Sequence, residues 1–335
     1  MKINVLVATV DFMYARLLSD NISEYHPDII EISDCNALES LREAISKRKY
    51  DVVLTDPAFI GNADLKPVKL PLVLWHENET AEDIPAEQGR IRKYQRVSSI
   101  VAAILELYAK VSKNRPGFES KYANITAVWS PAGGVGKSTV ALAYAAANAS
   151  EEKNVFYLNL EDFSGMPGYF KDNGKSISTV FEMLDNHDGN IKMLIQGICC
   201  NESGITYLCS PDNFDDMCIL SSENINDLIV SCAGLADELV IDLSSSYDAR
   251  TRMAFEHADK ILIVTDHAAP AGVKLAQFTS QNDVFENIKD KTVLVANKGG
   301  SLNEPYTGSM IFLPFIHSNN AEEIFKTLSV NSFDS

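Results

Sequence analysis

Residues 125–148 read ITAVWSPAGGVGKSTVALAYAAAN, and this stretch decides the fold of the larger part of the chain. The run ITAVW has the composition of a buried strand, and the alanine-rich segment that starts at Lys137 favours a helix. A glycine-rich loop joins the two directly. A strand that passes through a short loop into a helix is the repeating unit of parallel α/β sheets, so we expect an α/β fold here.

The loop SPAGGVGKST, residues 130–139, has the features of a phosphate-binding loop. Its glycines lack side chains, so their backbone N–H groups and those of the helix N-terminus can surround an anion. Lys137 supplies a positive charge for the β- and γ-phosphates, and Ser138 offers a hydroxyl to Mg²⁺. The alternative is a glycine turn with a chance Gly-Lys-Ser, which the flanking strand and helix disfavour. The predicted nucleotide-binding residues of the loop are Ala132, Gly133, Gly134, Val135, Gly136, Lys137, Ser138 and Thr139.

Apolar runs alternate with helical patterns on both sides of a polar segment. Residues 1–111 hold strand-like runs at 3–8, 29–32, 51–55 and 70–75 and helical patterns at 12–25, 37–46 and 98–111. Seven further strand-like runs lie in residues 125–335. Residues 112–124, SKNRPGFESKYAN, show no periodicity and contain Pro-Gly, which indicates a linker. We therefore expect a small α/β domain, a linker and a larger doubly wound, mostly parallel sheet.

Composition excludes several classes of function. The 335 residues include 29 basic and 46 acidic side chains, a formal net charge of −17 that falls mostly in residues 125–335. Such a surface repels nucleic acids and anionic lipids, so we expect neither as a partner. No apolar run reaches the roughly 18 residues of a membrane span, and the acidic start is unlike a secretory signal, so we expect a cytoplasmic protein. The six cysteines follow no zinc spacing and are interpreted as small buried side chains.

Four motifs in order resemble the deviant-Walker ATPases typified by MinD and ParA. GGVGKST is followed by VFYLNLED, LVIDL and LVANK. In that family a lysine precedes the loop glycines and reaches the partner's nucleotide in a dimer that encloses ATP. Ala132 stands at that position here. The resemblance therefore implies ATP and Mg²⁺ as cofactors, with weak or absent hydrolysis.

The resemblance also implies roles for residues outside the loop. Glu161 corresponds to the aspartate that positions the attacking water, with one added methylene, and with Lys137 it is the expected catalytic pair. Asp242 corresponds to the aspartate that holds Mg²⁺ through water, together with Ser138. Asn297 corresponds to the asparagine that recognises adenine, although a lone asparagine at a strand end is also a common turn former. Pro314 and Phe315 match the family's adenine-side loop. Arg250 and Arg252 are interpreted as surface arginines, with contact to a γ-phosphate as the alternative.

Residues 1–111 resemble a response-regulator receiver, which has a flavodoxin-like three-layer fold. The run YDVVLTD places Asp56 at the phosphoacceptor position, and Lys93 falls where the receiver lysine lies. A receiver also has an adjacent acidic pair that binds Mg²⁺ for phosphoryl transfer, whereas only Asp11 is available here. We therefore expect an atypical receiver that serves as a docking module and is not phosphorylated.

A receiver-like domain followed by a MinD/ParA-like ATPase resembles the TadZ/CpaE proteins. The resemblance implies a cytoplasmic, ATP-binding scaffold, recruited to a cell pole, for assembly of a tight-adherence (Flp-type) pilus secretion system. It implies a homodimer across the nucleotide face and contacts with pilus machinery through the receiver-like domain. The last residues, NNAEEIFKTLSVNSFDS, lack a lysine-rich face, so direct membrane binding is not expected. The alternative is a MinD/ParA-type ATPase that turns over and positions cellular machinery by its hydrolysis cycle.

Overall fold

The computed structural model describes residues 2–27, 29–76, 89–112, 123–150, 152–171, 174–186, 190–218, 220–300, 308–330 and 333. The chain forms two compact units, Met1–Lys113 and Asn114–Ser335, and each contains its own sheet. Of the predicted linker, the structure describes Ser112, Ala123 and Asn124, and the other linker residues lie outside the described residues.

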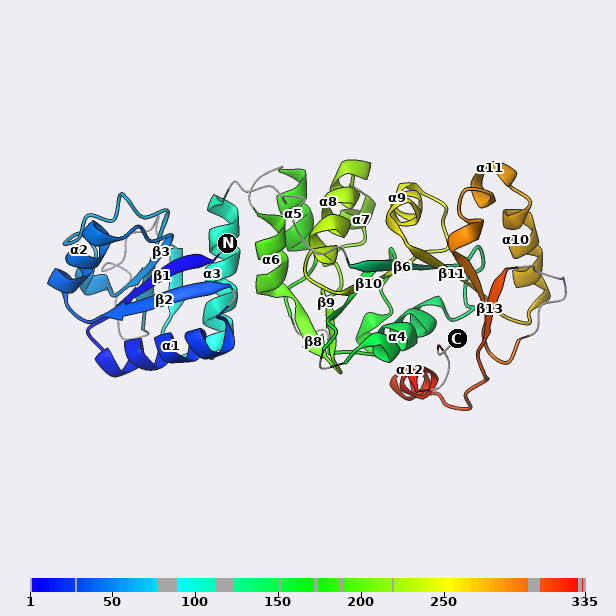
Figure 1. Cartoon of the computed structure of the whole chain (residues 1–335), viewed down its shortest axis with the longest axis horizontal. Helices are drawn as coiled ribbons and strands as arrows, with labels where there is room; N and C mark the ends of the chain where they lie inside the picture. Colours follow the sequence, from blue (N-terminus) through cyan, green and yellow to red (C-terminus); the bar gives the residue numbers. More distant parts are fainter. Residues whose placement is uncertain are drawn as a thin grey trace. The chain divides into compact units, whose positions relative to one another are not determined.

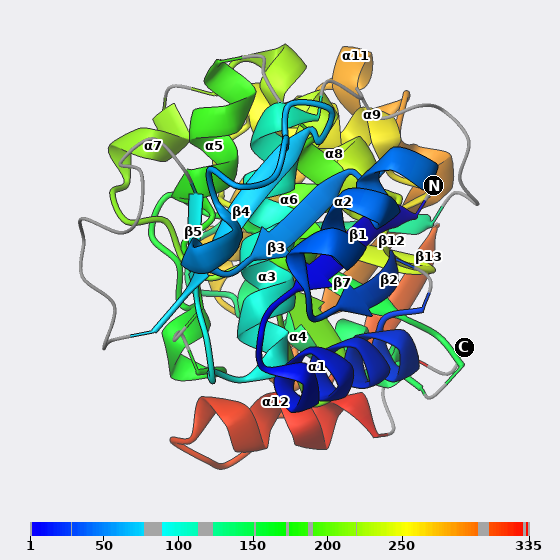
Figure 2. The same ribbon diagram turned by 90° about the vertical axis from the view of Figure 1, so that its left-hand side faces the viewer.

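The first unit has a five-stranded parallel sheet in the order β2-β1-β3-β4-β5 (Figure 2). This is the flavodoxin-like strand order, as expected from the sequence. Helix α1 packs beside α3, whereas Leu41 of α2 packs against the sheet residues Leu6 and Val53. Residues 56–69, between β3 and β4, form no α-helix. The elements are β1 (Ile3–Ala8), α1 (Phe12–Tyr25), β2 (Ile30–Cys35), α2 (Leu38–Lys47), β3 (Val52–Thr55), η1 (Pro57–Phe59), β4 (Leu70–Trp75), β5 (Gly89–Arg92) and α3 (Val97–Val111).

The second unit has an eight-stranded sheet in the order β13-β12-β11-β6-β10-β7-β9-β8. All pairs are parallel except β8 with β9, which confirms the predicted mostly parallel, doubly wound α/β sheet. The strands are β6 (Asn124–Trp129), β7 (Val155–Leu160), β8 (Cys200–Glu202), β9 (Ile205–Tyr207), β10 (Glu238–Leu243), β11 (Lys260–Thr265), β12 (Thr292–Ala296) and β13 (Ser309–Phe312).

Helices cover both faces of the larger sheet (Figure 1). Helices α4 (Lys137–Asn148) and α12 (Ala321–Ser329) pack together on one face, and α8 (Ser222–Ala233) and α9 (Ala249–His257) lie on the other. The remaining helices are α5 (Ser178–Asp185), α6 (Ile191–Ile198), α7 (Asp215–Cys218), α10 (Ala269–Thr279) and α11 (Asn282–Phe285), with short 3₁₀ turns η3 (Met166–Gly168) and η4 (Lys289–Lys291). Within the described part of the chain, no helix is both long and apolar enough to span a membrane.

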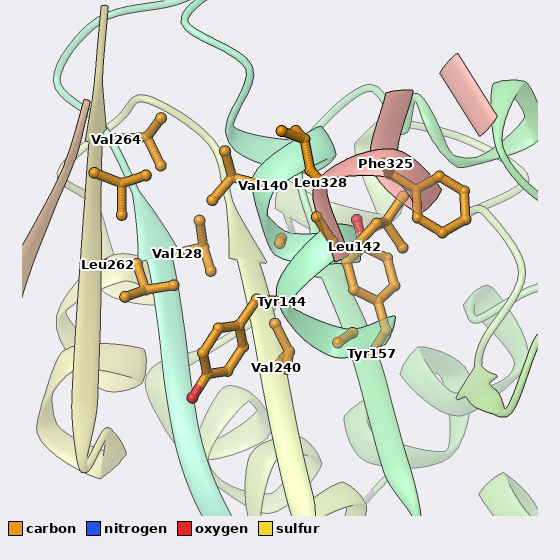
Figure 3. Close-up of a cluster of buried hydrophobic side chains, with 14 of the residues drawn as sticks. Val128, Val140, Leu142, Tyr144, Tyr157, Val240, Leu262, Val264, Phe325 and Leu328 are labelled. Atoms are coloured by element: carbon orange, nitrogen blue, oxygen red, sulfur yellow. The ribbon is translucent and has the colours of Figure 1, made fainter. Parts of the chain in front are cut away.

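The core under α4 fixes the start of that helix against the sheet. Val140 and Leu142 of α4 are fully buried among Val128, Val240 and Leu262 from three strands (Figure 3). The alanines of α4 add little bulk, so the helix axis can lie close to the strands. Because α4 packs against the sheet and β6 is an interior strand, the loop that joins them is supported at both ends.

Candidate nucleotide site

The loop of residues 130–136 lies where the carboxyl ends of β6, β10 and β7 meet. Gly134 and Gly136 have φ angles of 76° and 91°, a conformation that costs other residues energy. A Cβ atom on Gly136 would lie 2.4 Å from Asn297 Nδ2. The Ala132 N–H donates to Ser130 Oγ at 3.0 Å, which closes the first turn of the loop. Gly134 is therefore required by its backbone angle, and Gly136 by both its backbone angle and the close approach of Asn297.

Lys137, Ser138 and Glu161 lie together at the end of this loop. The Lys137 ammonium is buried, donates to Ser245 Oγ at 3.1 Å and lies 3.7 Å from Glu161 Oε1. The Ser138 hydroxyl donates to Glu161 Oε2 at 3.0 Å. The Glu161 N–H in turn donates to Asn159 Oδ1 at 2.9 Å, which fixes the chain just after β7. One carboxylate thus contacts both polar groups that the sequence assigns to phosphate and Mg²⁺.

Asp242, on β10, has no exposed surface, and its Oδ2 accepts a hydrogen bond from Tyr157 OH at 2.7 Å. Its Oδ1 is buried without a hydrogen-bond partner. Burial, and then the charge of Glu161, raise the pKa of Asp242 to about 7, although hydrogen bonds from Tyr157 and Ser138 and the charge of Lys137 act in the opposite direction. A buried carboxylate oxygen without a donor is suited to interact with a cation or its bound water, so the site fits a hard divalent ion. The described residues contain no cluster of three or more His, Cys, Asp or Glu side chains able to hold a metal, so water or phosphate would complete the coordination.

The turn after β12 contacts the back of the loop. Asn297 is buried and its Nδ2 donates to the carbonyl of Val135 at 2.9 Å. The Lys298 ammonium donates to the carbonyl of Gly134 at 2.6 Å and lies 3.3 Å from Asp266 Oδ2. Sequence reasoning identified Asn297 but missed Lys298, because a lysine after a strand gives no sign that it returns to a loop 164 residues earlier.

The predicted base-side residues lie beside the same turn. A Cβ atom built on Gly299 would be 3.7 Å from the Cβ of Phe315, and the N–H of Gly299 donates to the carbonyl of Leu313. Pro314 is exposed, and Phe315 is 52% exposed with its ring 4.7 Å from that of His317. Asn297, Pro314 and Phe315 are thus brought together at one side of the loop.

In the first unit, Asp56 is buried and surrounded by donors. Its Oδ2 accepts the Thr9 hydroxyl at 2.6 Å and the Val10 N–H at 2.8 Å, while its Oδ1 pairs with the Lys93 ammonium. Lys93 is buried as well and also donates to Thr9 Oγ1 at 3.0 Å. Asp56 and Lys93, which are far apart in the sequence, therefore form an internal ion pair.

Asp11 is held by other contacts. Its Oδ1 accepts the Tyr14 N–H at 3.0 Å, which caps α1, and its Oδ2 accepts the Tyr94 hydroxyl at 2.9 Å. These two hydrogen bonds lower the pKa of Asp11. The carboxylate of Asp11 thus serves the start of α1.

No family model and no curated protein sequence matches the chain, but solved structures do. A ParA family ATPase from Chlorobium tepidum TLS matches with a TM-score of 0.52 and 18% identity, over 63% of this chain and 93% of that chain. The chain contains the fold of a ParA family ATPase. A plasmid partition protein from Borrelia burgdorferi (TM-score 0.48, 18% identity, 63% of this chain and 98% of that chain) also matches. The septum site-determining protein MinD from Pyrococcus horikoshii OT3 matches as well, with a TM-score of 0.46 and 12% identity, over 62% of this chain and 94% of that chain.

Near the phosphate loop of this ParA-type fold, the interpretation of Arg250 as a surface residue is wrong. Its side chain is 12% exposed and pairs with Asp162 at 2.6 Å and with Asp248 at 2.7 Å. The guanidinium links the segment after β7 to the residue that caps α9. Arg252 is exposed, as expected.

Proposed function

We propose that the chain is an ATP-binding scaffold that takes Mg²⁺ together with the nucleotide. One observation carries this proposal: a glycine loop ends in a buried lysine and a serine hydroxyl, with the unpartnered oxygen of buried Asp242 nearby on β10. Residues 132–139 would hold the phosphates, Ser138 would hold Mg²⁺ directly and Asp242 through water, and Asn297, Pro314 and Phe315 would lie on the base side. Bound Mg²⁺ supplies positive charge that neutralises the phosphates.

Calorimetric titration of the purified chain with millimolar Mg·ATP tests this proposal. We expect heat of binding and a higher melting temperature, because a ligand that binds only the folded state stabilises it. Lys137→Ala should abolish both effects. Lys274→Ala, which removes an exposed lysine of α10, is the matched control and should change neither. Absence of both heat and thermal protection in the unsubstituted chain would overturn the proposal.

Slow hydrolysis follows from two departures at the site. Ala132 stands where the MinD/ParA family has a lysine. The Glu161 carboxylate accepts a hydrogen bond from Ser138 and lies 3.7 Å from the Lys137 ammonium. A carboxylate held in this way is poorly placed to orient an attacking water, and small errors of position are costly in rate. We expect steady-state turnover below about one per minute. A much faster rate that disappears in Lys137→Ala would reject the scaffold and support the turning-over ATPase.

Self-association across the nucleotide face is supported by an exposed aromatic pair. Phe163 is 78% and Phe214 47% exposed, and their rings stack 5.6 Å apart. They follow β7 and β9, whose carboxyl ends lie at the same edge as the phosphate loop. A partner that packs on this stacked pair would remove apolar surface from water, which favours association. We propose a homodimer that nucleotide stabilises.

Sedimentation with and without Mg·ATP tests the dimer. Phe163→Ser should weaken ATP-dependent association, whereas Val273→Ser, at an exposed valine of α10, should not. A monomer at all ATP concentrations would contradict this part of the proposal.

The cellular role rests on the resemblance to TadZ/CpaE proteins. We propose that the first unit docks pilus secretion machinery and that the chain, a cytoplasmic factor, reaches a cell pole through these contacts. Asp56 is only 3% exposed and its carboxylate is engaged by Thr9 and Val10, which disfavours phosphotransfer to it. A fluorescent fusion that forms a focus at the assembly site only when residues 1–111 are present is the expected result. A focus that persists without them would contradict docking through this unit.

A further inference from the structure

Two neighbouring carbonyls of the phosphate loop point at donors on the turn after β12. The carbonyl of Gly134 accepts from the Lys298 ammonium at 2.6 Å, and that of Val135 accepts from Asn297 Nδ2 at 2.9 Å. The two donors, Asn297 and Lys298, are adjacent in the sequence, so a single turn holds two adjacent peptide groups of the loop. Asn297 is buried, and its own N–H is tied to the carbonyl of Thr265 at 2.8 Å.

Holding these carbonyls also orients the loop amides. In a trans peptide the N–H points away from the C=O of the same peptide group, and no cis peptide occurs among the described residues. The peptide whose carbonyl is that of Gly134 carries the N–H of Val135, and the next carries the N–H of Gly136. When the turn draws both carbonyls to the back of the loop, both N–H groups face the opposite side. A cation on a carbonyl oxygen further polarises its peptide and strengthens that N–H as a donor.

The turn itself is built at a conformational cost. Lys298 has a φ of 58° and Gly299 one of 67°. A lysine in the left-handed region costs energy, and such residues persist where the surroundings enforce them. Gly300 completes the turn, since a Cβ there would lie 2.9 Å from the carbonyl oxygen of Asn297. This geometry directs the Lys298 side chain to Gly134.

The alternative is that Lys298 serves only its ion pair with Asp266. Lys298 is 35% exposed in that pair, and partly solvated ion pairs contribute little to stability. Asp266 is also engaged by the N–H of Ala268 at 3.0 Å, so its carboxylate does not depend on Lys298. The short contact with Gly134 is therefore the more informative one.

We propose that Lys298 is a positioning residue for the phosphate site: with Asn297 it holds the loop so that the N–H groups of Val135 and Gly136 face a polyphosphate. The inference rests on the proposed nucleotide binding and deepens it. The Lys298 ammonium lies on the carbonyl side of the loop, so it acts on the phosphate site through the loop peptides. The ligand class that benefits is an inorganic or nucleoside polyphosphate, because the two amides act on phosphate oxygens.

The test compares Lys298→Met with Lys298→Arg and with Lys274→Met as the exposed-lysine control. Affinities for Mg·ATP and for magnesium tripolyphosphate are measured by titration on the full chain. A hydrogen bond to a charged group corresponds to about a tenfold to hundredfold change in affinity. We expect Lys298→Met to lose that factor for both ligands, Lys298→Arg to retain most of the affinity, and Lys274→Met to match the unsubstituted chain. Hydrogen exchange of the peptide that contains residues 130–136 should be faster in Lys298→Met without any ligand.

The outcomes separate this inference from the proposed function. If neither the unsubstituted chain nor Lys298→Met binds Mg·ATP, the proposed function is overturned. The exchange measurement alone then decides whether Lys298 holds the loop. If the unsubstituted chain and Lys298→Met bind Mg·ATP with equal affinity, and hydrogen exchange of residues 130–136 is equally fast in both, the inference is overturned and the proposed function stands. A loss of affinity for Mg·ATP with no loss for tripolyphosphate would also overturn it, because the effect would then lie on the base side.

Discussion

Gly136 is the residue of the phosphate loop at which a side chain is least tolerated. Its φ of 91° and the 2.4 Å approach of Asn297 Nδ2 to any Cβ leave no room for a side chain. Gly133 is the natural comparison, because a Cβ there would meet no atom within 4 Å and its φ is not positive. The two glycines share a loop but differ in what they require.

Gly136→Ala should therefore destabilise the chain by about 1–3 kcal/mol and weaken Mg·ATP binding at least tenfold. Urea denaturation and titration measure the two effects. Gly133→Ala should stay within about 0.5 kcal/mol in stability. Equal effects of the two substitutions would show that the left-handed backbone and the Asn297 contact are unimportant.

The local sequence pattern indicates only the contiguous part of the candidate site, whereas Glu161, Asp242 and Asn297 were assigned through the family resemblance. Residues 132–139 follow one another, and the strand and helix on either side set their geometry. Arg250 and Lys298 instead act through partners 88 and 164 residues earlier in the chain, Asp162 and Gly134. Such partners depend on the strand order, which no local pattern encodes. For the same reason the sequence could not show that Glu161 contacts both Lys137 and Ser138.

The sequence of helix α12 does not show which part of the molecule its apolar side packs against. It indicates only a short helix without a lysine-rich face. In the structure Phe325 is fully buried, with its ring 5.9 Å from those of both Tyr169 and Phe170. Helix α12 thus packs on α4 and contributes Phe325 to the same core.

Phe325→Ala should cost about 3–5 kcal/mol, the usual effect of removing a buried aromatic ring. Chemical denaturation measures the change. Val330→Ala, just after α12 at a side chain that is 70% exposed, should have an effect near zero. A small effect of Phe325→Ala would mean that α12 detaches from the sheet in solution.

In the first unit, Asp51 connects four elements. It lies just before β3 and accepts hydrogen bonds from Lys69 before β4 at 2.6 Å, Tyr108 on α3 at 3.0 Å and the N–H of Asn4 on β1 at 3.0 Å. Burial raises the pKa of Asp51, but these donors outweigh it and the net shift is downward from the ordinary value of 3.8. The folded state therefore favours the ionised carboxylate.

A lowered pKa in the folded state gives stability that is fully present above the unfolded pKa and is lost as pH falls through the folded one. The unsubstituted chain should thus lose stability below about pH 4 in part through Asp51. Asp51→Asn should be less stable at pH 7 by about 1–3 kcal/mol and lose less on acidification. Asp20→Asn, at an exposed aspartate of α1, serves as the control. An identical acid response in Asp51→Asn would contradict this account.

The alternation of strands and helices predicted the architecture of the whole molecule, and two strands escaped it for a physical reason. Strand β5 has one buried residue, Ile91, and β8 has none, so neither shows the apolar run of a buried parallel strand. Both lie at a sheet edge, where one side of the strand has no neighbour. Interior strands carried the pattern because both of their faces are buried.

Because each unit has its own sheet and core, the two should unfold in separate steps. Differential scanning calorimetry of the whole chain should show two transitions, and Mg·ATP at a hundred times its dissociation constant should stabilise only one, by about 2.7 kcal/mol. Phe325→Ala should lower that ligand-sensitive transition, and Asp51→Asn should lower the other. Lys137→Ala should abolish the ligand shift and leave both transitions present. A single transition that moves as a whole with Mg·ATP would instead show that the folding of the first unit is coupled to ligand binding in the second.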